Sequence, residues 1–223
     1  MIITYILDLD DTLYCEHDYV KSGFLAVAKA LAERSDYGVD RIYHELLSVW
    51  TTEGRGKVFD TVISKLHIQM ETQLLVDLYR SHRPTIQLYE DAKIFLEYAQ
   101  QHELKLGLIT DGASQVQWNK IESLRIKPYF QAIVVSDDFG GTSYWKPHEA
   151  PYLKAAKLLA VLPQNCCYVG DNPHKDFITA KRLGMKTIRI VRPVGDHMNT
   201  KLEPEYEADE TMTSLASLLP YSE

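Results

Sequence analysis

The chain opens on a run of apolar residues that stops abruptly at acidic ones. Residues 2–7 form a largely apolar, β-branched run, and Asp8, Asp10 and Asp11 follow within four positions. A short run of this kind is typical of a buried strand. Open α/β sheets bind ligands in the crevice beyond the carboxyl ends of their strands. We therefore expect Asp8 and Asp10 to mark a site, although an acidic surface turn after a strand would give the same pattern.

After Thr12 the apolar spacing changes from that of a strand to that of a helix. Apolar residues recur three or four positions apart in successive segments, which predicts four short amphipathic helices. Breaks in this pattern lie at about residues 36–40, 53–57, 67–71 and 83–84, and three of the four contain glycine or proline. Helices of this kind bury their apolar faces against one another. We interpret residues 15–84 as a helical bundle inserted after the first strand.

From Asp91 onward, strand and helix patterns alternate. The predicted strands are 105–110, 132–135, 166–169 and 187–191. Helices are predicted from Asp91, around 115–123, 149–160 and 175–183, and in a closing segment near 212–219. Alternation of this kind predicts a parallel sheet with right-handed crossovers. The predicted fold is α/β, a Rossmann-like doubly wound parallel sheet of residues 1–14 and 85–223 with an inserted four-helix cap at 15–84.

Length, charge and cysteine content narrow the class of protein. A chain of 223 residues is large for one core and small for two equal ones, which favours a main domain with a lesser insertion. The 24 basic and 31 acidic residues give a net charge of −7, which attracts neither nucleic acid nor an anionic membrane. Neither a signal segment nor a span-length apolar run is visible, so we expect a cytoplasmic protein. The three cysteines fit neither a disulfide framework nor a zinc site.

Polar residues that can carry chemistry follow each predicted strand. They are Asp8 and Asp10, then Thr110, Asp111 and Gly112, then Asp137 and Asp138, then Asp171. The carboxyl ends of parallel strands share one edge of a sheet, so these residues should lie close together. The Thr110 hydroxyl and the amides after it suit phosphate oxygens, and Lys146 can supply a point charge. Crowded carboxylates repel one another, and Mg²⁺ would relieve that repulsion.

These residues form four ordered motifs that resemble those of the haloacid dehalogenase superfamily of phosphatases with a small helical cap. The motifs are residues 8–12, 108–111, 146–147 and 169–176. The resemblance implies that Asp8 is the nucleophile, that Asp10 protonates the leaving oxygen and then activates water, and that Thr110 binds the phosphoryl oxygens. It also implies that Lys146 stabilises the charge on Asp8, and that Asp8, Asp171 and the main-chain carbonyl of Asp10 hold Mg²⁺.

The sequence departs from the family pattern at two places. Asp11 stands where many relatives have glycine, and His148-Glu149 follow Lys146-Pro147 where the family often has a second proline. The second departure leaves the start of the following helix open. By the same resemblance, Asp176 orders the groups around the site.

The resulting prediction is a Mg²⁺-dependent phosphomonoester hydrolase that acts through an aspartyl phosphate. Its expected substrate is a small phosphorylated metabolite, a sugar phosphate or a nucleoside monophosphate, and its oligomeric state stays open. One alternative is a phosphomutase of the same family. Another is a phosphoacceptor signalling module, although its acceptor aspartate would be expected later in a shorter chain.

Within the predicted cap, one break has the composition of a binding loop. In residues 53–57 two glycines flank Arg55, which gives a mobile backbone carrying a planar donor. We expect Arg55 to contact the part of the substrate remote from the phosphoryl group. A solvated connection between helices would show the same pattern.

Overall fold

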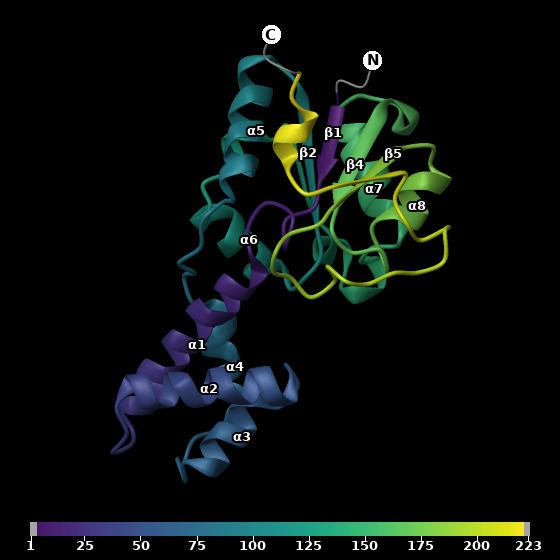
Figure 1. Ribbon diagram of the computed structural model, residues 1–223. Coiled ribbons are helices and arrows are strands. Elements are labelled where there is room, and N and C mark those ends of the chain that lie inside the picture. Colours follow the sequence, from purple (N-terminus) through teal and green to yellow (C-terminus); the bar gives the residue numbers. More distant parts are fainter. Residues whose placement is uncertain (1–3, 221–223) are drawn as a thin grey trace. The chain divides into compact units, whose positions relative to one another are not determined.

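A six-stranded, all-parallel sheet is the framework of the larger part of the protein. The computed structural model describes residues 4–220 (Figure 1). The strands lie in the order β3-β2-β1-β4-β5-β6, and every neighbouring pair is parallel. They are β1 (Thr4–Leu7), β2 (Lys105–Thr110), β3 (Ala132–Val135), β4 (Cys166–Gly170), β5 (Lys186–Ile190) and β6 (Glu210–Met212). The chain order reverses at β1, so the crevice between β1 and β4 is the switch point of the sheet.

Helices cover both faces of the sheet. They are α5 (Glu90–Gln101), α6 (Ser114–Ser123), α7 (Glu149–Leu158) and α8 (Phe177–Arg182). Side chains alternate between the faces along a strand. Ile6 of β1 accordingly packs in one core with Tyr152 of α7 and Phe177 of α8. Its neighbour Tyr5 meets Phe95 of α5 edge-on, at 5.4 Å between ring centroids. The predicted doubly wound α/β sheet is confirmed.

Two details of the predicted elements need comment. The first strand is confirmed from Thr4 to Leu7, whereas Ile2 and Ile3 lie outside the described residues. The closing helix predicted near 212–219 is wrong. The structure has the short edge strand β6 there, followed by a single 3₁₀ turn at Leu215–Leu218. The Asp209 carboxylate accepts hydrogen bonds from the Thr187 amide and hydroxyl, at 2.8 and 2.9 Å, which draws this segment into the sheet.

The doubtful start of α7 is settled by a side-chain cap. The helix begins at Glu149, and the Nδ1 atom of His148 accepts a hydrogen bond from the Ala150 amide at 3.1 Å. A capping acceptor satisfies one of the unpaired N–H groups at a helix start. With His148 as its cap, the helix starts at Glu149 without a second proline.

The chain divides into two compact units, one comprising the chain up to Glu16 and from Ile86 onward, the other His17–Thr85. The second, called the helical unit below, contains α2 (Val39–Glu53), α3 (Val58–Lys65), α4 (Thr72–Ser81) and nearly all of α1 (Glu16–Ala32). Its core joins residues of all four helices, among them Phe24, Leu46, Val62 and Leu75. A capping role for this unit stays a prediction. Among residues 4–220, no helix combines the length and apolar character that a membrane span requires.

Candidate active site

The switch point of the sheet brings the first and last acidic motifs together. Strands β1 and β4 pair in parallel with Leu7 beside Val169, and the Asp8 amide donates to the Val169 carbonyl at 2.8 Å. Asp8 follows Leu7 directly, and Asp171 follows Val169 after one intervening glycine, Gly170. Each offers a carboxylate oxygen that lies within 4.8 Å of the other and of one from Asp176, and all three residues are buried.

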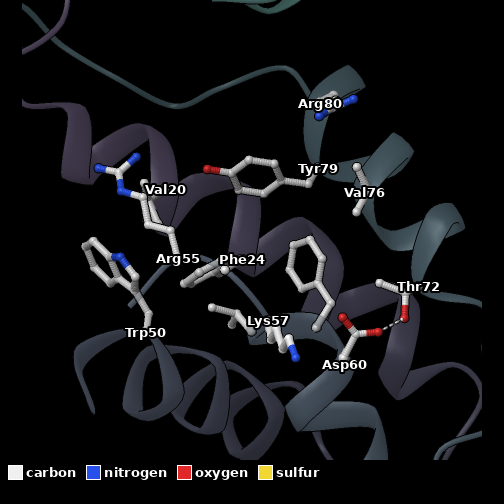
Figure 2. A pocket seen from close by; sticks show the side chains of 13 residues that line it. Val20, Phe24, Trp50, Arg55, Lys57, Asp60, Thr72, Val76, Tyr79 and Arg80 are labelled. Carbon is white, nitrogen blue, oxygen red and sulfur yellow. Dashed lines mark hydrogen bonds between the residues drawn. The ribbon is translucent and has the colours of Figure 1, made fainter. Parts of the chain in front are cut away.

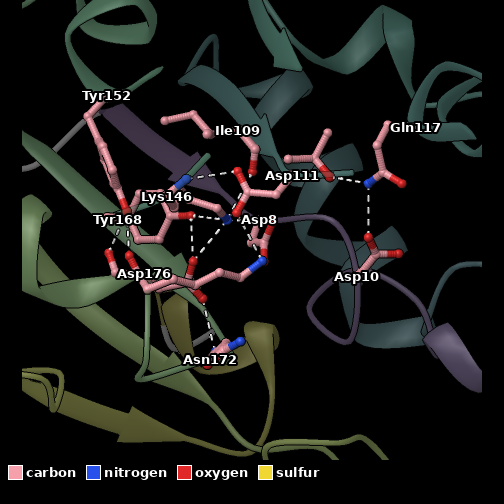
Figure 3. Close-up of polar contacts among 12 residues, drawn as sticks. Asp8, Asp10, Ile109, Asp111, Gln117, Lys146, Tyr152, Tyr168, Asn172 and Asp176 are labelled. Carbon is pink, nitrogen blue, oxygen red and sulfur yellow. Dashed lines mark hydrogen bonds and ion pairs between the residues drawn. The ribbon is translucent and has the colours of Figure 1, made fainter. Parts of the chain in front are cut away.

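Lys146 is the counter-charge at the centre of this cluster (Figure 3). Its Nζ lies 2.8 Å from Asp8 Oδ1 and 2.9 Å from Asp176 Oδ1, and its side chain is 0% exposed. It also donates to the Tyr168 hydroxyl at 2.9 Å. Burial alone would lower the pKa of Lys146, but the carboxylates of Asp176 and Asp8 outweigh it and raise that pKa well above its ordinary value. The Lys146 ammonium is therefore permanently charged beside Asp8.

Asp176 holds Lys146 in place. Its Oδ1 also accepts from the Tyr168 hydroxyl at 3.1 Å, and its Oδ2 accepts from the Asn172 amide at 2.9 Å. A Cβ atom at Gly170 would clash with this carboxylate, so the glycine at the end of β4 is needed for the close approach. Both carboxylate oxygens of Asp176 are thus engaged by contacts with Lys146, Tyr168 and the loop after β4.

The carboxylates of Asp8 and Asp171 favour the binding of a further positive charge. Burial, followed by the charges of Asp176 and Asp8, raises the pKa of Asp171 well above its ordinary value. Burial raises the pKa of Asp8 to about 6 in spite of Lys146. Ionised carboxylates this close in a buried site are unfavourable unless a cation pairs with them. Buried oxygen donors of this kind fit a hard divalent cation such as Mg²⁺.

The motif at residues 108–111, at the end of β2, contacts the loop that carries Lys146. The Asp111 carboxylate accepts from the Lys146 main-chain amide at 3.1 Å, and the Lys175 ammonium lies 3.1 Å from its other oxygen. Gly112 follows with φ of 133°, which a side chain would strain. The sequence assigned only the amide of Asp111 to the site. Its side chain proves to fix the loop that carries Lys146.

Asp10 lies in a separate set of contacts. Its carboxylate accepts from the Tyr14 hydroxyl, from the Gln117 amide at 2.9 Å and from the Lys120 ammonium at 2.7 Å. In Figure 3 it lies on the Gln117 side of the site, while Asp8, Lys146 and Asp176 gather on the other. Burial would raise the pKa of Asp10, but Lys120 and the hydrogen bonds from Tyr14 and Gln117 outweigh it and lower that pKa. These donors favour the carboxylate form of Asp10, which must therefore take up a proton before it can donate one.

The departure at Asp11 has a structural reason. Its φ is 50°, in the left-handed region that favours glycine. The side chain offsets this cost by accepting from the Glu16 amide, at the start of α1, at 2.8 Å, and from the Asp196 amide at 3.3 Å. Asp11 therefore ties the loop after β1 to the segment after β5.

A cavity of about 320 Å³ collects most of these groups. Its lining includes Asp8, Asp10, Asp111, Lys146 and Asp171, all expected from the sequence. Thr110 and Gly112 are not among the described residues that line it, and the Thr110 hydroxyl is engaged by the Gln117 amide. The predicted substrate contact Arg55 belongs to the helical unit.

Several lining or supporting groups were missed by sequence reasoning. They are Gln117, Lys120, Trp145, Asn172, Lys175 and His197. A signal existed for the first two, since Gln117 and Lys120 stand three apart and share a helix face with the buried Ile121. Polar residues on the buried face of a helix are unusual and could have indicated a site.

A doubly wound parallel sheet with an aspartate cluster and a lysine at its switch point defines the class of protein. The chain matches the model of the haloacid dehalogenase-like hydrolase family over residues 5–190, and it belongs to that family. It is 30% identical to a glyceraldehyde 3-phosphate phosphatase of Pyrococcus furiosus, covering 95% of this chain and 89% of that one. A protein of the same name from Methanocaldococcus jannaschii is 29% identical, with 98% and 96% covered. Among solved structures, a putative beta-phosphoglucomutase from Thermotoga maritima shares the fold at a TM-score of 0.68, with 19% identity and 96% and 95% covered.

Proposed function

We propose that this protein is a Mg²⁺-dependent phosphatase that hydrolyses a small phosphorylated metabolite through an aspartyl phosphate on Asp8. The observation that carries the proposal is the buried Asp8 carboxylate, 2.8 Å from the Lys146 ammonium and beside Asp171 at the switch point. Membership of a hydrolase family and similarity to proteins named phosphatases support it.

The reaction runs in two balanced steps. A carboxylate oxygen of Asp8 attacks phosphorus, the bond from phosphorus to the leaving oxygen breaks, and that oxygen takes a proton from the carboxyl of Asp10. A water then attacks the phosphorus of the aspartyl phosphate and gives a proton to the Asp10 carboxylate. The bond to the Asp8 oxygen breaks, inorganic phosphate leaves, and both residues return to their starting forms.

Other residues of the site stabilise charge during these steps. Thr110, together with the Asp111 and Gly112 amides, binds the phosphoryl oxygens, and Lys146 neutralises Asp8 and the oxygens of the group being transferred. Mg²⁺ would be held by Asp8, Asp171 and the Asp10 carbonyl, and when bound it would neutralise phosphoryl charge.

The size of the site favours a compact substrate. The cavity of about 320 Å³ is lined largely by charged groups, which suits a short polar molecule better than a nucleoside. Similarity to glyceraldehyde 3-phosphate phosphatases points the same way. We therefore place phosphorylated sugars of triose size ahead of nucleoside monophosphates.

A panel of phosphomonoesters tests the proposal. Triose phosphates, hexose phosphates, phosphoserine and nucleoside monophosphates are each incubated with the protein, with Mg²⁺ or with EDTA, and inorganic phosphate is measured. We expect release that requires Mg²⁺ and is fastest for the smallest sugar phosphates. Undiminished release in EDTA would contradict the metal requirement, and an isomerised sugar phosphate without phosphate release would identify a mutase.

The helical unit has a cavity of its own, and Arg55 is among its lining residues (Figure 2). This cavity of about 330 Å³ has aromatic walls and cationic side chains at its lining. Phe24, Trp50 and Tyr79 supply aromatic surface, and Arg55 is among the cations. Gly54, with φ of 79°, ends α2 and starts the short connection that carries Arg55. These features support Arg55 as the contact to the part of the substrate remote from the phosphoryl group.

Arg55→Ala is expected to lower kcat/KM for the best natural substrate by about 10- to 150-fold, because a charge-assisted hydrogen bond contributes roughly 1.5–3 kcal/mol. The loss on a small aryl phosphate, which has no remote polar group, should be a few-fold at most. Arg41→Ala is the matched control, since Arg41 is exposed in the same unit and packs over the Tyr37 ring. Equal losses on both substrates would rule out this role for Arg55.

A further inference from the structure

Helix α6 places two polar side chains where an amphipathic helix should be apolar. Gln117 is 1% exposed and Lys120 is 3% exposed, and both share a face with the fully buried Ile121. A buried lysine costs free energy unless it is paired, and methionine would fill the same volume without that cost. Departures from local rules of this kind concentrate at functional sites.

Both side chains converge on Asp10. The Lys120 ammonium lies 2.7 Å from Asp10 Oδ1. The Gln117 amide nitrogen donates to Asp10 Oδ2 at 2.9 Å (Figure 3). Two oxygens of one carboxylate are thus held by two donors that come from one helix. This arrangement fixes both the position and the plane of the carboxylate, because each oxygen has its own donor.

Gln117 makes a second bond that joins two parts of the proposed machinery. Its amide nitrogen also donates to the hydroxyl of Thr110. An amide nitrogen carries two hydrogens, so it can serve both acceptors at once. Thr110 ends β2 and Asp10 follows β1, so a single side chain sets the distance between residues of two different strands.

We propose that Gln117 and Lys120 are positioning residues that hold the Asp10 carboxyl group beside the phosphoryl group bound at Thr110, within reach of its leaving oxygen. The inference rests on the proposed function, since it assumes that Asp10 transfers the proton. Neither residue transfers a proton or a phosphoryl group itself. Both act through Asp10.

The test compares substrates that need a proton on the leaving oxygen with substrates that do not. In Lys120→Met, kcat/KM for an alkyl phosphate such as glycerol 3-phosphate should fall by about 10- to 100-fold, part of the 10²- to 10⁴-fold that general acid catalysis supplies. For 4-nitrophenyl phosphate the fall should be about threefold or less, because its leaving group departs without a proton. Since kcat/KM reports the steps up to departure of the leaving group, later hydrolysis of the aspartyl phosphate does not obscure the comparison.

A double-mutant cycle separates positioning from a general structural effect. When Asp10 is already asparagine, Lys120→Met should change kcat/KM for the alkyl phosphate by less than about twofold. Lys127→Met serves as control, because Lys127 is an exposed lysine just after α6 that pairs with Glu122 at 2.9 Å. Should Lys120→Met fail to fold, Lys120→Gln, which removes the charge but keeps a polar side chain, carries the same comparison, with the same expected preference.

Two results with an active enzyme would overturn the positioning role. One is an equal loss of kcat/KM on alkyl and aryl phosphates in Lys120→Met. The other is an undiminished effect of Lys120→Met when Asp10 is already asparagine. A wild-type protein that releases phosphate from no phosphomonoester would overturn the proposed function and this role with it. The two failures are therefore distinguishable by the activity of the unmodified chain.

Discussion

Asp8→Asn is expected to abolish phosphate release while the protein stays folded. The amide keeps the shape of the side chain but cannot form the aspartyl phosphate, so turnover should fall by roughly 10⁴-fold or more, as when a catalytic nucleophile is removed. The fold should tolerate the change because it removes one of several crowded carboxylates, although it also weakens the pair with Lys146. Activity on the best substrate and the melting temperature, recorded without Mg²⁺, are the two measurements.

Asp138→Asn is the control for Asp8→Asn. Asp138 is an exposed acidic residue that follows β3, where its carboxylate accepts from the hydroxyl of Ser114 and, at 3.2 Å, from the indole of Trp118. Its replacement should leave turnover within a few-fold of the wild type. Measurable turnover by folded Asp8→Asn, above that of the buffer alone, would refute the nucleophile assignment.

Lys146→Met should lose both activity and stability. The side chain is fully enclosed between the carboxylates of Asp8 and Asp176, so its removal leaves buried negative charge without a partner. Breaking a buried pair in this way costs about 3–5 kcal/mol. In a chain of this size that corresponds to a fall of about 6–20 °C in melting temperature. Thermal unfolding followed by circular dichroism measures it.

Two further variants make this second prediction specific. Lys175→Met removes an ammonium whose side chain is 26% exposed, and it should cost clearly less than Lys146→Met. Adding Asp176→Asn to Lys146→Met should restore part of the lost stability, because one of the two stranded carboxylates becomes neutral. A Lys146→Met protein that melts within one or two degrees of the wild type would show that the cluster does not depend on this lysine.

The sequence was most informative where a functional residue could be located from its neighbours in the chain. Asp8 could be located because an apolar run ends in acidic residues, and Lys146 because it stands in a loop between strand and helix patterns. The parallel sheet followed from the alternation of helix and strand patterns. These features depend on neighbours in the chain, which a sequence displays directly.

Features that depend on distant partners were not predictable in the same way. Residues 212–219 look like an amphipathic helix, and only the Asp209 contact with Thr187 shows why a strand forms just before them. Likewise, the Asp11 carboxylate accepts a hydrogen bond from the amide of Asp196. This contact helps to hold the left-handed backbone of Asp11, and it could not be predicted because Asp196 lies far along the chain. The role of Gln117 required knowing that β2 lies beside β1.

The strand order has a consequence for how the nucleophile is assembled during synthesis. Strand β1 is made before the other strands, yet it lies between β2 and β4, which begin only at Lys105 and Cys166. Its apolar residues Ile6 and Leu7, both 0% exposed in the finished sheet, cannot form these strand pairings until β2 and β4 have been synthesised. Pairings of such long sequence separation form slowly and leave unpaired strand edges exposed meanwhile. Asp8, the proposed nucleophile, thus directly follows the strand whose two partners are both synthesised much later.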